Sequence, residues 1–212
     1  MRFDYIIIGA GSAGCVLSNR LSENQNNKVA VFEAGGSSDI WKVKMPLALL
    51  YTMHDPKYNW KYYSEPEPHL NNRRLFCPRG KMIGGCSAHN GMVFVRGNRN
   101  DYERWEGFGL KSWSYDKVLP YFKKIENWSE GENQYRGSLG LLPVSQSKNT
   151  NPLFKAFLGA ASEAGYKINP DMNGKYQEGF GMFDTTIHNG ERASVSKYYL
   201  DPVKKRKNLN IF

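Results

Sequence analysis

The sequence predicts an α/β fold built on a parallel βαβ unit, and three observations near the start of the chain support this. Tyr5–Ile8 is a β-branched apolar run that leads straight into a glycine-rich turn. Apolar residues at helical spacing follow the turn, and a second apolar run occupies Val29–Phe32. Two apolar strands joined by a helix form the basic unit of a parallel sheet. We therefore expect the βαβ core to span about residues 3–36.

Local patterns define each element of this core. Tyr5–Ile8 has no polar alternation, which is typical of a strand buried on both faces of a sheet. The helix that follows places apolar side chains on one face, at Ala13, Val16, Leu17 and Leu21. Asn24–Asn27 make a polar turn, and Val29–Phe32 forms the second strand.

A long middle section connects this core to further glycine-rich sequence. Residues 36–77 are rich in Pro, Tyr and Trp and show little periodicity, so we expect irregular structure there. The aromatic stretch Tyr58–Tyr63 is expected to pack against the rest of the protein or a partner rather than to form a recognition surface. A second glycine-rich block covers Arg79–Gly91, and the apolar run Met92–Val95 follows it.

Two helices are predicted in the second half of the chain. The first spans Tyr115–Ile125, with Ser114 as its N-cap and Pro120 as the position of a kink. The second begins after the N-cap Asn151 with a proline, and it ends before Gly165, a residue that favours helix C-termini. The apolar face of this second helix consists of Phe154, Phe157, Leu158 and Ala161.

Composition excludes several classes of protein. The chain has 212 residues, 40% of them hydrophobic, and its mean hydropathy is −0.61. No stretch approaches the ~20 apolar residues that span a bilayer. The 29 basic and 20 acidic residues give a net charge of +9, but these charges are scattered apart from the run Lys204–Lys207. We therefore expect a basic, solvated surface and no nucleic-acid partner.

The cysteine and histidine patterns exclude other kinds of site. The three cysteines form no CxxC pair, which favours reduced thiols and a cytoplasmic location. The four histidines show neither HxxxH nor HExxH spacing, so no metal site is expected. The chain also has no GxSxG sequence, which excludes the nucleophile turn of the α/β-hydrolases.

The strongest local motif is Gly9-x-Gly11-x-x-Gly14, between the first strand and its helix. Gly9 permits the tight turn, Gly11 lets the backbone approach a pyrophosphate, and Gly14 allows the helix to pack closely on the strand. Glu33 lies 19 residues after Gly14, at the end of the second strand, where its carboxylate can accept hydrogen bonds from an adenosine ribose. This setting predicts a dinucleotide site. The motif alone does not separate FAD from NAD, although its place at the start of the chain is common where FAD is the resident cofactor.

The second glycine-rich block favours FAD. The consecutive small residues at 84–88 allow a backbone to pass close to a flat or anionic group. The block is not a Walker A loop, because no glycine stands five residues before Gly80. A turn that served packing alone would need fewer glycines, so we expect the block to contact the cofactor. Cys86, inside the block, is expected to be a small apolar filler.

These ordered motifs resemble the glucose–methanol–choline (GMC) flavin oxidoreductases, and among them the choline-dehydrogenase-like branch. The resemblance extends along nearly the whole chain. The blocks that carry it are Asp4–Gly14, Glu33–Gly35, Arg79–Lys81, Gly84–Gly85, Asn90–Gly97, Asp101–Tyr102, Trp105, Trp113–Tyr115, Leu119–Phe122, Gln177–Gly181, Gly190–Arg192 and Tyr199–Pro202. The resemblance implies that residues 1–212 are the N-terminal part of a Rossmann-like FAD-binding domain. A flavin-contacting segment is expected at about 78–97, and a mostly helical and irregular insert at about 98–190.

The resemblance also implies the residues that bind the cofactor. Those expected near the adenosine and the pyrophosphate are Gly9, Gly11, Ser12, Gly14, Glu33 and Ala34. Those expected in the second glycine-rich segment, beside the pyrophosphate and the isoalloxazine, are Met82, Gly84, Gly85, Ser87, His89, Asn90, Gly91, Met92 and Val93.

His89 departs from the commonest family pattern, in which an aliphatic residue stands at this position. Gly84–Asn90 is similar to the segment of choline oxidases in which a histidine is bonded covalently to the flavin. One hypothesis is that His89 carries FAD through an imidazole nitrogen. The other is a neutral histidine that forms a hydrogen bond near the flavin without a covalent link. Both remain open on the sequence alone.

The resemblance implies an FAD-dependent oxidoreductase that acts on the CH–OH group of a choline-like or other primary alcohol, with hydride transfer to flavin N5. The general base of the family is a histidine far toward the C-terminus, so no catalytic residue is assigned in this sequence. Leu209–Phe212 resembles the start of a strand and family members are much longer. We therefore expect a fragment that lacks the C-terminal substrate-binding part. The alternatives are an NAD-dependent Rossmann dehydrogenase and a non-catalytic fragment that only binds a dinucleotide; the electron acceptor is left open.

Overall fold

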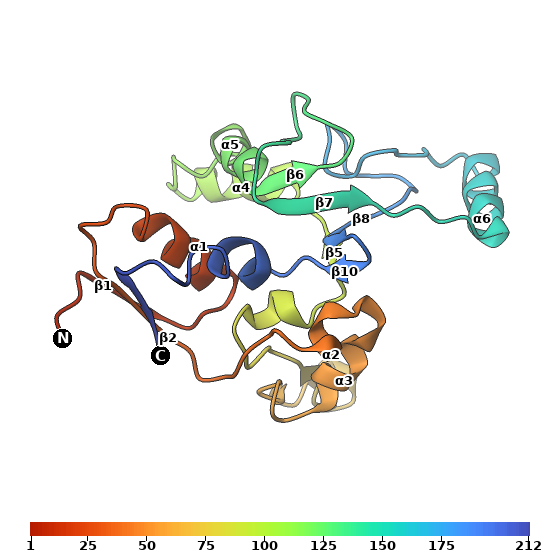
Figure 1. Cartoon of the computed structure of the whole chain (residues 1–212). Helices are drawn as coiled ribbons and strands as arrows, with labels where there is room; N and C mark the ends of the chain where they lie inside the picture. Colours follow the sequence, from red (N-terminus) through yellow and green to blue (C-terminus); the bar gives the residue numbers. More distant parts are fainter. The chain divides into compact units, whose positions relative to one another are not determined.

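The computed structural model describes all 212 residues, and the chain divides into two compact units (Figure 1). Unit 1 comprises Met1–Met92 and Asn189–Phe212, and unit 2 comprises Val93–His188. Each unit has its own sheet and its own helices.

Unit 1 is built around a parallel sheet of three strands in the order β1-β2-β11. The strands are β1 (Tyr5–Ile8), β2 (Val29–Phe32) and β11 (Leu209–Ile211). Helix α1 (Ser12–Leu21) connects β1 to β2 and packs against a π-helix at Ser196–Leu200, as Figure 1 shows. The predicted α/β class and its βαβ core are confirmed.

The expectation that the first strand is buried on both faces is wrong. Only Ile7 is buried in β1, whereas Ile6 and Ile8 are 62% and 80% exposed. Ile7 faces α1, because its Cγ2 lies 3.4 Å from the position that a Cβ at Gly14 would take. β1 is an edge strand, and no element of unit 1 covers its other face. The central strand β2, in contrast, is buried from its first residue to Val31.

The segment between β2 and residue 92 contains more regular structure than the sequence predicts. Its helices and strands are α2 (Trp41–Lys44), α3 (Leu49–His54), β3 (Tyr62–Tyr63) and β4 (Phe76–Cys77), with 3-10 helices at Pro46–Ala48, Pro68–Leu70 and Gly85–Ala88. Each element is too short for a hydrophobic period to repeat, which explains why the pattern is invisible in the sequence. A buried cluster of Val43, Tyr58, Met82 and Ala88 holds this segment together.

Unit 2 contains a mixed sheet of four strands in the order β5-β8-β7-β6. The strands are β5 (Val93–Phe94), β6 (Glu126–Trp128), β7 (Leu142–Gln146) and β8 (Asp184–Thr185). β6 and β7 run parallel, while β8 is antiparallel to both β7 and β5. The short strand β9 (Ile187–His188) ends unit 2, and β10 (Glu191–Arg192) belongs to unit 1.

The helices of unit 2 are α4 (Arg99–Gly107), α5 (Tyr115–Ile125) and α6 (Pro152–Glu163). The predicted helices α5 and α6 are present. Asn151 caps α6, because its Oδ1 accepts a hydrogen bond from the backbone N of Leu153 at 2.9 Å. Ser114 precedes α5 as expected, but its side chain forms no capping hydrogen bond. Helix α4 is not predicted, because its mostly polar and charged sequence carries too few apolar residues to show a helical period.

A buried ion network lies at the centre of unit 2. Arg136 is fully buried, and its guanidinium contacts Glu126 at 3.2 Å. The same guanidinium contacts one oxygen each of Asp171 and Asp184 at 2.7 Å. Arg96 also pairs with Glu126, at 2.5 Å. Charges at this depth must be paired and hydrogen-bonded, and here two cations and three carboxylates satisfy one another.

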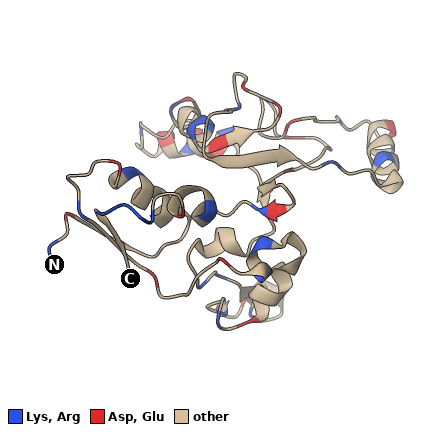
Figure 2. Ribbon diagram, in the orientation of Figure 1, with Lys and Arg blue, Asp and Glu red and all other residues tan.

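Basic and acidic residues are spread along both units, as Figure 2 shows. Within the basic run near the end of the chain, Lys204 pairs with Asp201 at 2.9 Å. No helix of the structure is both long enough and apolar enough to cross a membrane.

Candidate functional site

The glycine turn between β1 and α1 leaves the start of that helix without a protein partner. Gly11 is the N-cap of α1, and no side chain caps the helix. The first N–H groups of a helix have no acceptor within the helix, and the helix dipole adds partial positive charge at the same end. The turn can therefore bind an anionic group through its backbone.

The three glycines of the motif differ in what surrounds them. Gly9 adopts a φ of +90°, which a residue with a side chain rarely does. A Cβ at Gly14 would lie 2.0 Å from the carbonyl oxygen of Gly9, so glycine is required for α1 to pack on the turn. A Cβ at Gly11 would meet no protein atom within 4 Å. The space beside Gly11 is therefore open.

The carboxylate of Glu33, just after β2, is directed at the glycine turn. Its Oε2 accepts a hydrogen bond from the backbone N of Ala10 at 2.8 Å, and its Oε1 accepts one from Gly35 at 2.9 Å. Each carboxylate oxygen can accept a further bond. Glu33 and Ala34 both line the cavity described below, so a ligand hydroxyl could reach this carboxylate.

The second glycine-rich segment lies directly against the first. The backbone N of Gly84 donates to the carbonyl oxygen of Ala10 at 2.7 Å. A Cβ at Gly85 would lie 2.8 Å from the Cα of Gly11, and one at Gly84 would lie 2.7 Å from Ser196 Oγ. Packing of the chain on itself therefore accounts for these two glycines. Contact with a cofactor is therefore not needed to explain why these two positions are glycine.

A cavity of about 650 Å³ lies where the two glycine-rich segments meet. The predicted residues that line it are Gly9, Gly11, Glu33, Ala34 and Gly85. The lining residues that the sequence reasoning missed are Ile8, Phe32, Trp60, Gly80 and Phe212. The cavity thus joins apolar walls to a few polar groups, as ligand pockets usually do.

Strand order could have found three of the missed residues. Ile8 and Phe32 end β1 and β2, and Phe212 directly follows β11. Open α/β sheets bind their ligands at the carboxyl ends of parallel strands, so these positions are expected at a site. The rings of Phe32 and Phe212 stack with centroids 4.9 Å apart. Trp60 comes from the aromatic stretch, and the Nζ of Lys81 lies 4.8 Å from its ring centroid.

His89 is buried in the second segment, with 4% of its surface exposed. Its Nδ1 is buried and has no hydrogen-bond partner. Burial lowers the pKa of His89, and the positive charges of Arg192 and Arg79 lower it further. The imidazole is therefore neutral at neutral pH, and one of its nitrogens keeps a free lone pair.

The other predicted residues of the second segment form its internal framework. Ser87 Oγ donates to the carbonyl oxygen of Gly84 at 2.7 Å and accepts a bond from the backbone N of Val195 at 3.0 Å. Asn90 Oδ1 accepts a bond from the backbone N of Met92 at 3.1 Å. Met82 is fully buried in the core beneath the segment.

The predicted residues are not all in one unit. Ser12 is the first residue of α1, and Gly91 and Met92 end the second glycine-rich segment within unit 1. Val93 belongs to unit 2, where it begins β5. All predicted residues except Val93 therefore lie in unit 1.

Two cysteines lie near the glycine-rich segments. Cys15 is buried beneath the turn, where its Sγ donates to the carbonyl oxygen of Ala10 at 3.2 Å. Burial raises the pKa of Cys15 to about 12, so this thiol is unreactive at neutral pH. Cys86 is exposed, and its role as a small apolar filler stays a prediction.

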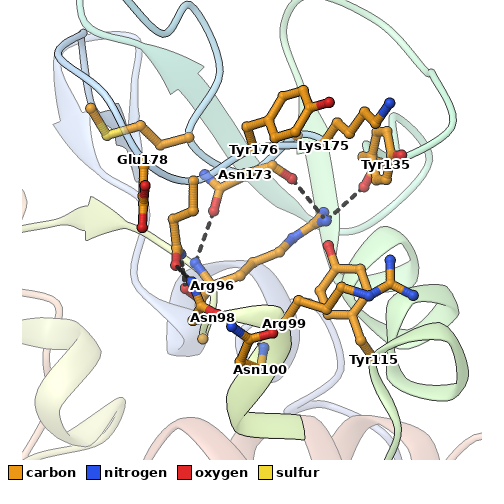
Figure 3. Close-up of a pocket in the computed structure, with 14 residues that line it drawn as sticks. Arg96, Asn98, Arg99, Asn100, Tyr115, Tyr135, Asn173, Lys175, Tyr176 and Glu178 are labelled. Atoms are coloured by element: carbon orange, nitrogen blue, oxygen red, sulfur yellow. Dashed lines mark hydrogen bonds between the residues drawn. The ribbon is translucent and has the colours of Figure 1, made fainter. Parts of the chain in front are cut away.

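A polar pocket of about 280 Å³ lies in unit 2 (Figure 3). Arg96 donates from Nη1 to the carbonyl oxygen of Tyr135 at 2.6 Å, and its backbone N donates to Asn173 Oδ1 at 2.8 Å. Asn98 Nδ2 donates to Gln177 Oε1 at 2.9 Å. These donors have partners in the pocket wall, whereas Arg96 Nε has none, and no predicted site residue lines the pocket. The pocket lies where hydrogen bonds join the segment Arg96–Asn98 to other loops of unit 2.

The residues of unit 1 fit a flavin dinucleotide. The start of α1 is uncapped and the space beside Gly11 is open, as a bound pyrophosphate requires. In unit 1, His89 Nδ1 in the second segment and Arg192 Nη2 in β10 are buried without a hydrogen-bond partner; the third such atom, Arg96 Nε, lies in unit 2. Buried polar atoms without a partner are rare in folded proteins, so the two in unit 1 point to a group that the chain does not supply.

Comparison with known proteins leads to the family that the motifs resemble. The family described as GMC oxidoreductase matches residues 3–212. The oxygen-dependent choline dehydrogenase of Rhizobium etli (strain CIAT 652) is 51% identical over 211 residues, which cover 100% of this chain and 38% of that protein. The chain thus spans less than half the length of this curated relative.

Solved structures share the fold. Pyridoxine 4-oxidase from Mesorbium loti matches with a TM-score of 0.94 and 30% identity, over 100% of this chain and 42% of that chain. An FAD-dependent oxidoreductase from Chaetomium thermophilum matches with a TM-score of 0.88 and 28% identity, over 100% of this chain and 38% of that chain.

Proposed function

The chain belongs to the GMC oxidoreductase family, and on that premise we propose that it is the FAD-binding part of an enzyme that oxidises the CH–OH group of an alcohol. The observation that carries the proposal is the open backbone at Gly11, beside the uncapped N-terminus of α1. The cavity at this point has room for the adenosine half of a dinucleotide. The relatives span a longer chain, so the activity concerns the whole protein.

Each part of the site has a role in this proposal. The N–H groups at the start of α1 hold the pyrophosphate, and Glu33 accepts hydrogen bonds from the adenosine ribose. Gly84–Ser87 and Asn90–Val93 run beside the pyrophosphate and the isoalloxazine. The flavin, when bound, accepts the hydride that leaves the alcohol carbon. The residues of this chain bind and orient the cofactor, and none of them is assigned the proton transfer.

We propose that His89 contacts the flavin, either as a neutral imidazole without a covalent link or through a bond from an imidazole nitrogen. The support is that His89 is buried and neutral, with an Nδ1 that has no partner within the chain. A neutral imidazole nitrogen is nucleophilic, whereas an imidazolium is not. Acid precipitation of the holoprotein distinguishes the two cases. Yellow colour that stays in the pellet supports the bond, and complete release to the supernatant excludes it.

We propose a choline-like primary alcohol as the substrate. The support is the name of a relative that is 51% identical to this chain, a choline dehydrogenase. One solved structure, at 30% identity, is a pyridoxine 4-oxidase, so a protein with this fold can also act on a substrate other than choline. The electron acceptor is left unassigned.

The visible spectrum of the purified protein tests this function. A flavoprotein absorbs in the blue, and an NAD-dependent dehydrogenase does not, so an absorption band of flavin supports the proposal. A folded preparation that retains NAD and no flavin would overturn it. Anaerobic addition of choline to a protein with the length of the relatives should then bleach the band. The 212-residue chain alone serves as the control, and it should bind flavin without bleaching.

We also propose that the protein works in a reducing compartment, the cytoplasm. The support is that Cys15, Cys77 and Cys86 are all unpaired.

A further inference from the structure

Arg192 is a buried cation without an acidic partner. It is 2% exposed, and burial lowers its pKa to about 10, which leaves it protonated at neutral pH. The other two buried arginines, Arg96 and Arg136, both pair with Glu126. Arg192 forms no ion pair. Removing an unpaired charge from water is unfavourable, so this position needs an explanation beyond packing.

The hydrogen bonds of Arg192 converge on the residues that flank His89. Its Nη1 donates to the carbonyl oxygen of Asn90 at 2.7 Å, to Asn90 Oδ1 at 2.9 Å and to the carbonyl oxygen of Ser87 at 3.4 Å. Its Nε donates to the carbonyl oxygen of Val43, the buried residue of α2, at 3.0 Å. One guanidinium thus fastens the loop on both sides of His89 to the core of unit 1.

The same strand end also fixes the start of this loop. The backbone N of Val195, three residues after Arg192, donates to Ser87 Oγ at 3.0 Å. Asn90 Oδ1 accepts bonds from both Arg192 Nη1 and the backbone N of Met92. Arg192, the last residue of β10, and Val195 after it therefore act together as a clamp on residues 87–92.

We propose that Arg192 is a positioning residue, which fixes the loop from Ser87 to Asn90 and so presents the His89 imidazole to the cofactor. The proposal rests on the FAD-binding function proposed above. The unpartnered atom His89 Nδ1 lies within the loop that the clamp holds, and the unpartnered Arg192 Nη2 lies on the clamp itself. This is the arrangement expected of a loop that is built before its ligand arrives.

The charge of Arg192 has a second effect on His89. After burial, the two groups that lower the pKa of His89 are Arg192 and Arg79, and no carboxylate acts against them. Arg192 therefore disfavours the imidazolium form. Arg79 donates from Nη1 to the carbonyl oxygen of Pro78 and stays in place when Arg192 is changed.

Two substitutions separate the charge from the hydrogen-bond geometry. Arg192→Lys keeps the charge but cannot bridge α2 and the loop, because an ammonium lacks the planar fork of a guanidinium. Arg192→Gln loses both. Arg206→Gln is the matched control. Arg206 also donates to neutral oxygens, those of Asn19 and Ser22 at 2.7 Å, but it lies away from this loop.

The measurements are the NMR titration of His89 in the cofactor-free 212-residue chain and the Kd for FAD. A His89→Gln variant assigns the His89 signal. We expect Arg192→Gln to raise the pKa of His89 and to weaken FAD binding by about tenfold or more, the cost of losing hydrogen bonds to a charged group. Arg192→Lys should weaken FAD binding while the pKa of His89 stays low. Arg206→Gln should change neither quantity.

The outcomes distinguish this proposal from the proposed function. If the wild-type chain fails to bind FAD, the proposed function falls, and the His89 titration alone decides the role of Arg192. If Arg192→Gln folds and leaves both the His89 pKa and the Kd for FAD unchanged, Arg192 is a structural residue and the proposal is overturned. If Arg192→Gln does not fold, the decision falls to Arg192→Lys, for which an unchanged Kd overturns the proposal.

Discussion

Six residues at the start of α1 contain three glycines whose surroundings make different demands. Gly9 needs its positive φ, and Gly14 needs the absence of a side chain because the turn carbonyl occupies that space. Neither constraint applies to Gly11: it has no positive φ, and a Cβ there would meet no protein atom within 4 Å. Because Gly11 also lines the cavity, we attribute its lack of a side chain to the ligand, and this difference can be tested one residue at a time.

Replacing Gly11 by serine should remove FAD binding while the fold stays intact. A serine is a favoured N-cap, so the stability of α1 should be equal or slightly higher. Its Cβ and hydroxyl would fill the space that a pyrophosphate needs beside the backbone. FAD titration and thermal unfolding of the variant check the two halves of this prediction.

Two other glycines provide the controls. Gly14→Ala should destabilise the protein strongly, because a Cβ there would lie 2.0 Å from the Gly9 carbonyl oxygen. Gly36→Ala should affect neither stability nor FAD binding, since its Cβ would meet no atom within 4 Å and Gly36 does not line the cavity. Loss of stability in Gly11→Ser comparable to that in Gly14→Ala would contradict the assignment of Gly11 to the ligand.

His89 should make the free energy of unfolding depend on pH in the acid range. An unfolded histidine titrates near pH ~6.5, and the pKa of His89 in the fold is lower. Below that pH the unfolded chain binds a proton that the folded chain does not. Acid therefore reduces the free energy of unfolding by up to about 1.4 kcal/mol per pH unit, until His89 itself is protonated in the fold.

The difference between wild type and His89→Gln isolates this contribution, because the other three histidines are kept. Urea unfolding of both proteins from pH 8 down to pH 5 measures it. The two curves should run parallel above pH ~6.5 and converge below it. Curves that stay parallel through pH 5 would show that His89 titrates normally.

Among the helices, the two predicted caps turn out to differ in their hydrogen bonds. Asn151 Oδ1 accepts a bond from Leu153, whereas the side chain of Ser114 caps nothing. Asn151→Ala should therefore cost about 1 kcal/mol of stability, and Ser114→Ala should cost less. Chemical unfolding of the two variants checks this order. Equal losses of stability in the two variants would mean that the type of the N-cap residue, and not its hydrogen bond, determines how much it stabilises the helix.

The ion network of unit 2 predicts a large effect from one core substitution. Arg136→Met removes the positive charge that pairs with the buried carboxylates of Asp184 and Glu126. Breaking one side of a buried ion pair typically destabilises by about 3–5 kcal/mol. Arg104, whose pair with Asp101 is exposed, is the control. Arg104→Met should change the free energy of unfolding by less than about 1 kcal/mol.

The contrast between the elements shows what the sequence could and could not predict. β2 follows from its apolar run, and α5 and α6 follow from their apolar spacing and N-cap residues. The short elements before residue 92 lack such signals, since tertiary contacts hold them. Helix α4 has an N-cap in Asn98, but its polar sequence shows no apolar period. The network around Arg136 has no local signal either, because it joins residues far apart in the chain.

The residues of the candidate site likewise fall into those that the sequence predicted and those that it could not predict. The motif predicted the turn at Gly9–Gly14 and the acid Glu33, because their residue types and spacing are specific. The sequence could not predict that Phe212 and Trp60 line the same cavity, since only the folded chain brings these distant residues together. Arg192 was visible as part of a family block, but its bonds to Asn90 appear only in the fold.

On the scale of the whole molecule, the edge strand β1 of unit 1 leaves apolar side chains exposed. Ile6 is 62% exposed on the edge strand β1. Exposed apolar edge strands promote association between chains. Ile6→Thr keeps a β-branched residue in the strand and should reduce self-association of the 212-residue chain, as measured by sedimentation velocity.

Leu17 supplies the control for this prediction. It is 49% exposed, but it lies on helix α1 and not on a strand edge. Leu17→Gln removes a similar apolar surface and should leave association unchanged. If both variants reduce association equally, general hydrophobicity rather than the strand edge is responsible.

The measurement that tests the account most directly is an equilibrium titration of the cofactor-free chain with FAD, with NAD as competitor. If Gly11 lies against the cofactor, we expect one FAD bound per chain, little competition from NAD, and loss of binding in Gly11→Ser but not in Gly36→Ala. A folded chain that does not bind FAD, or that binds it equally well with serine at position 11, would contradict the central claim.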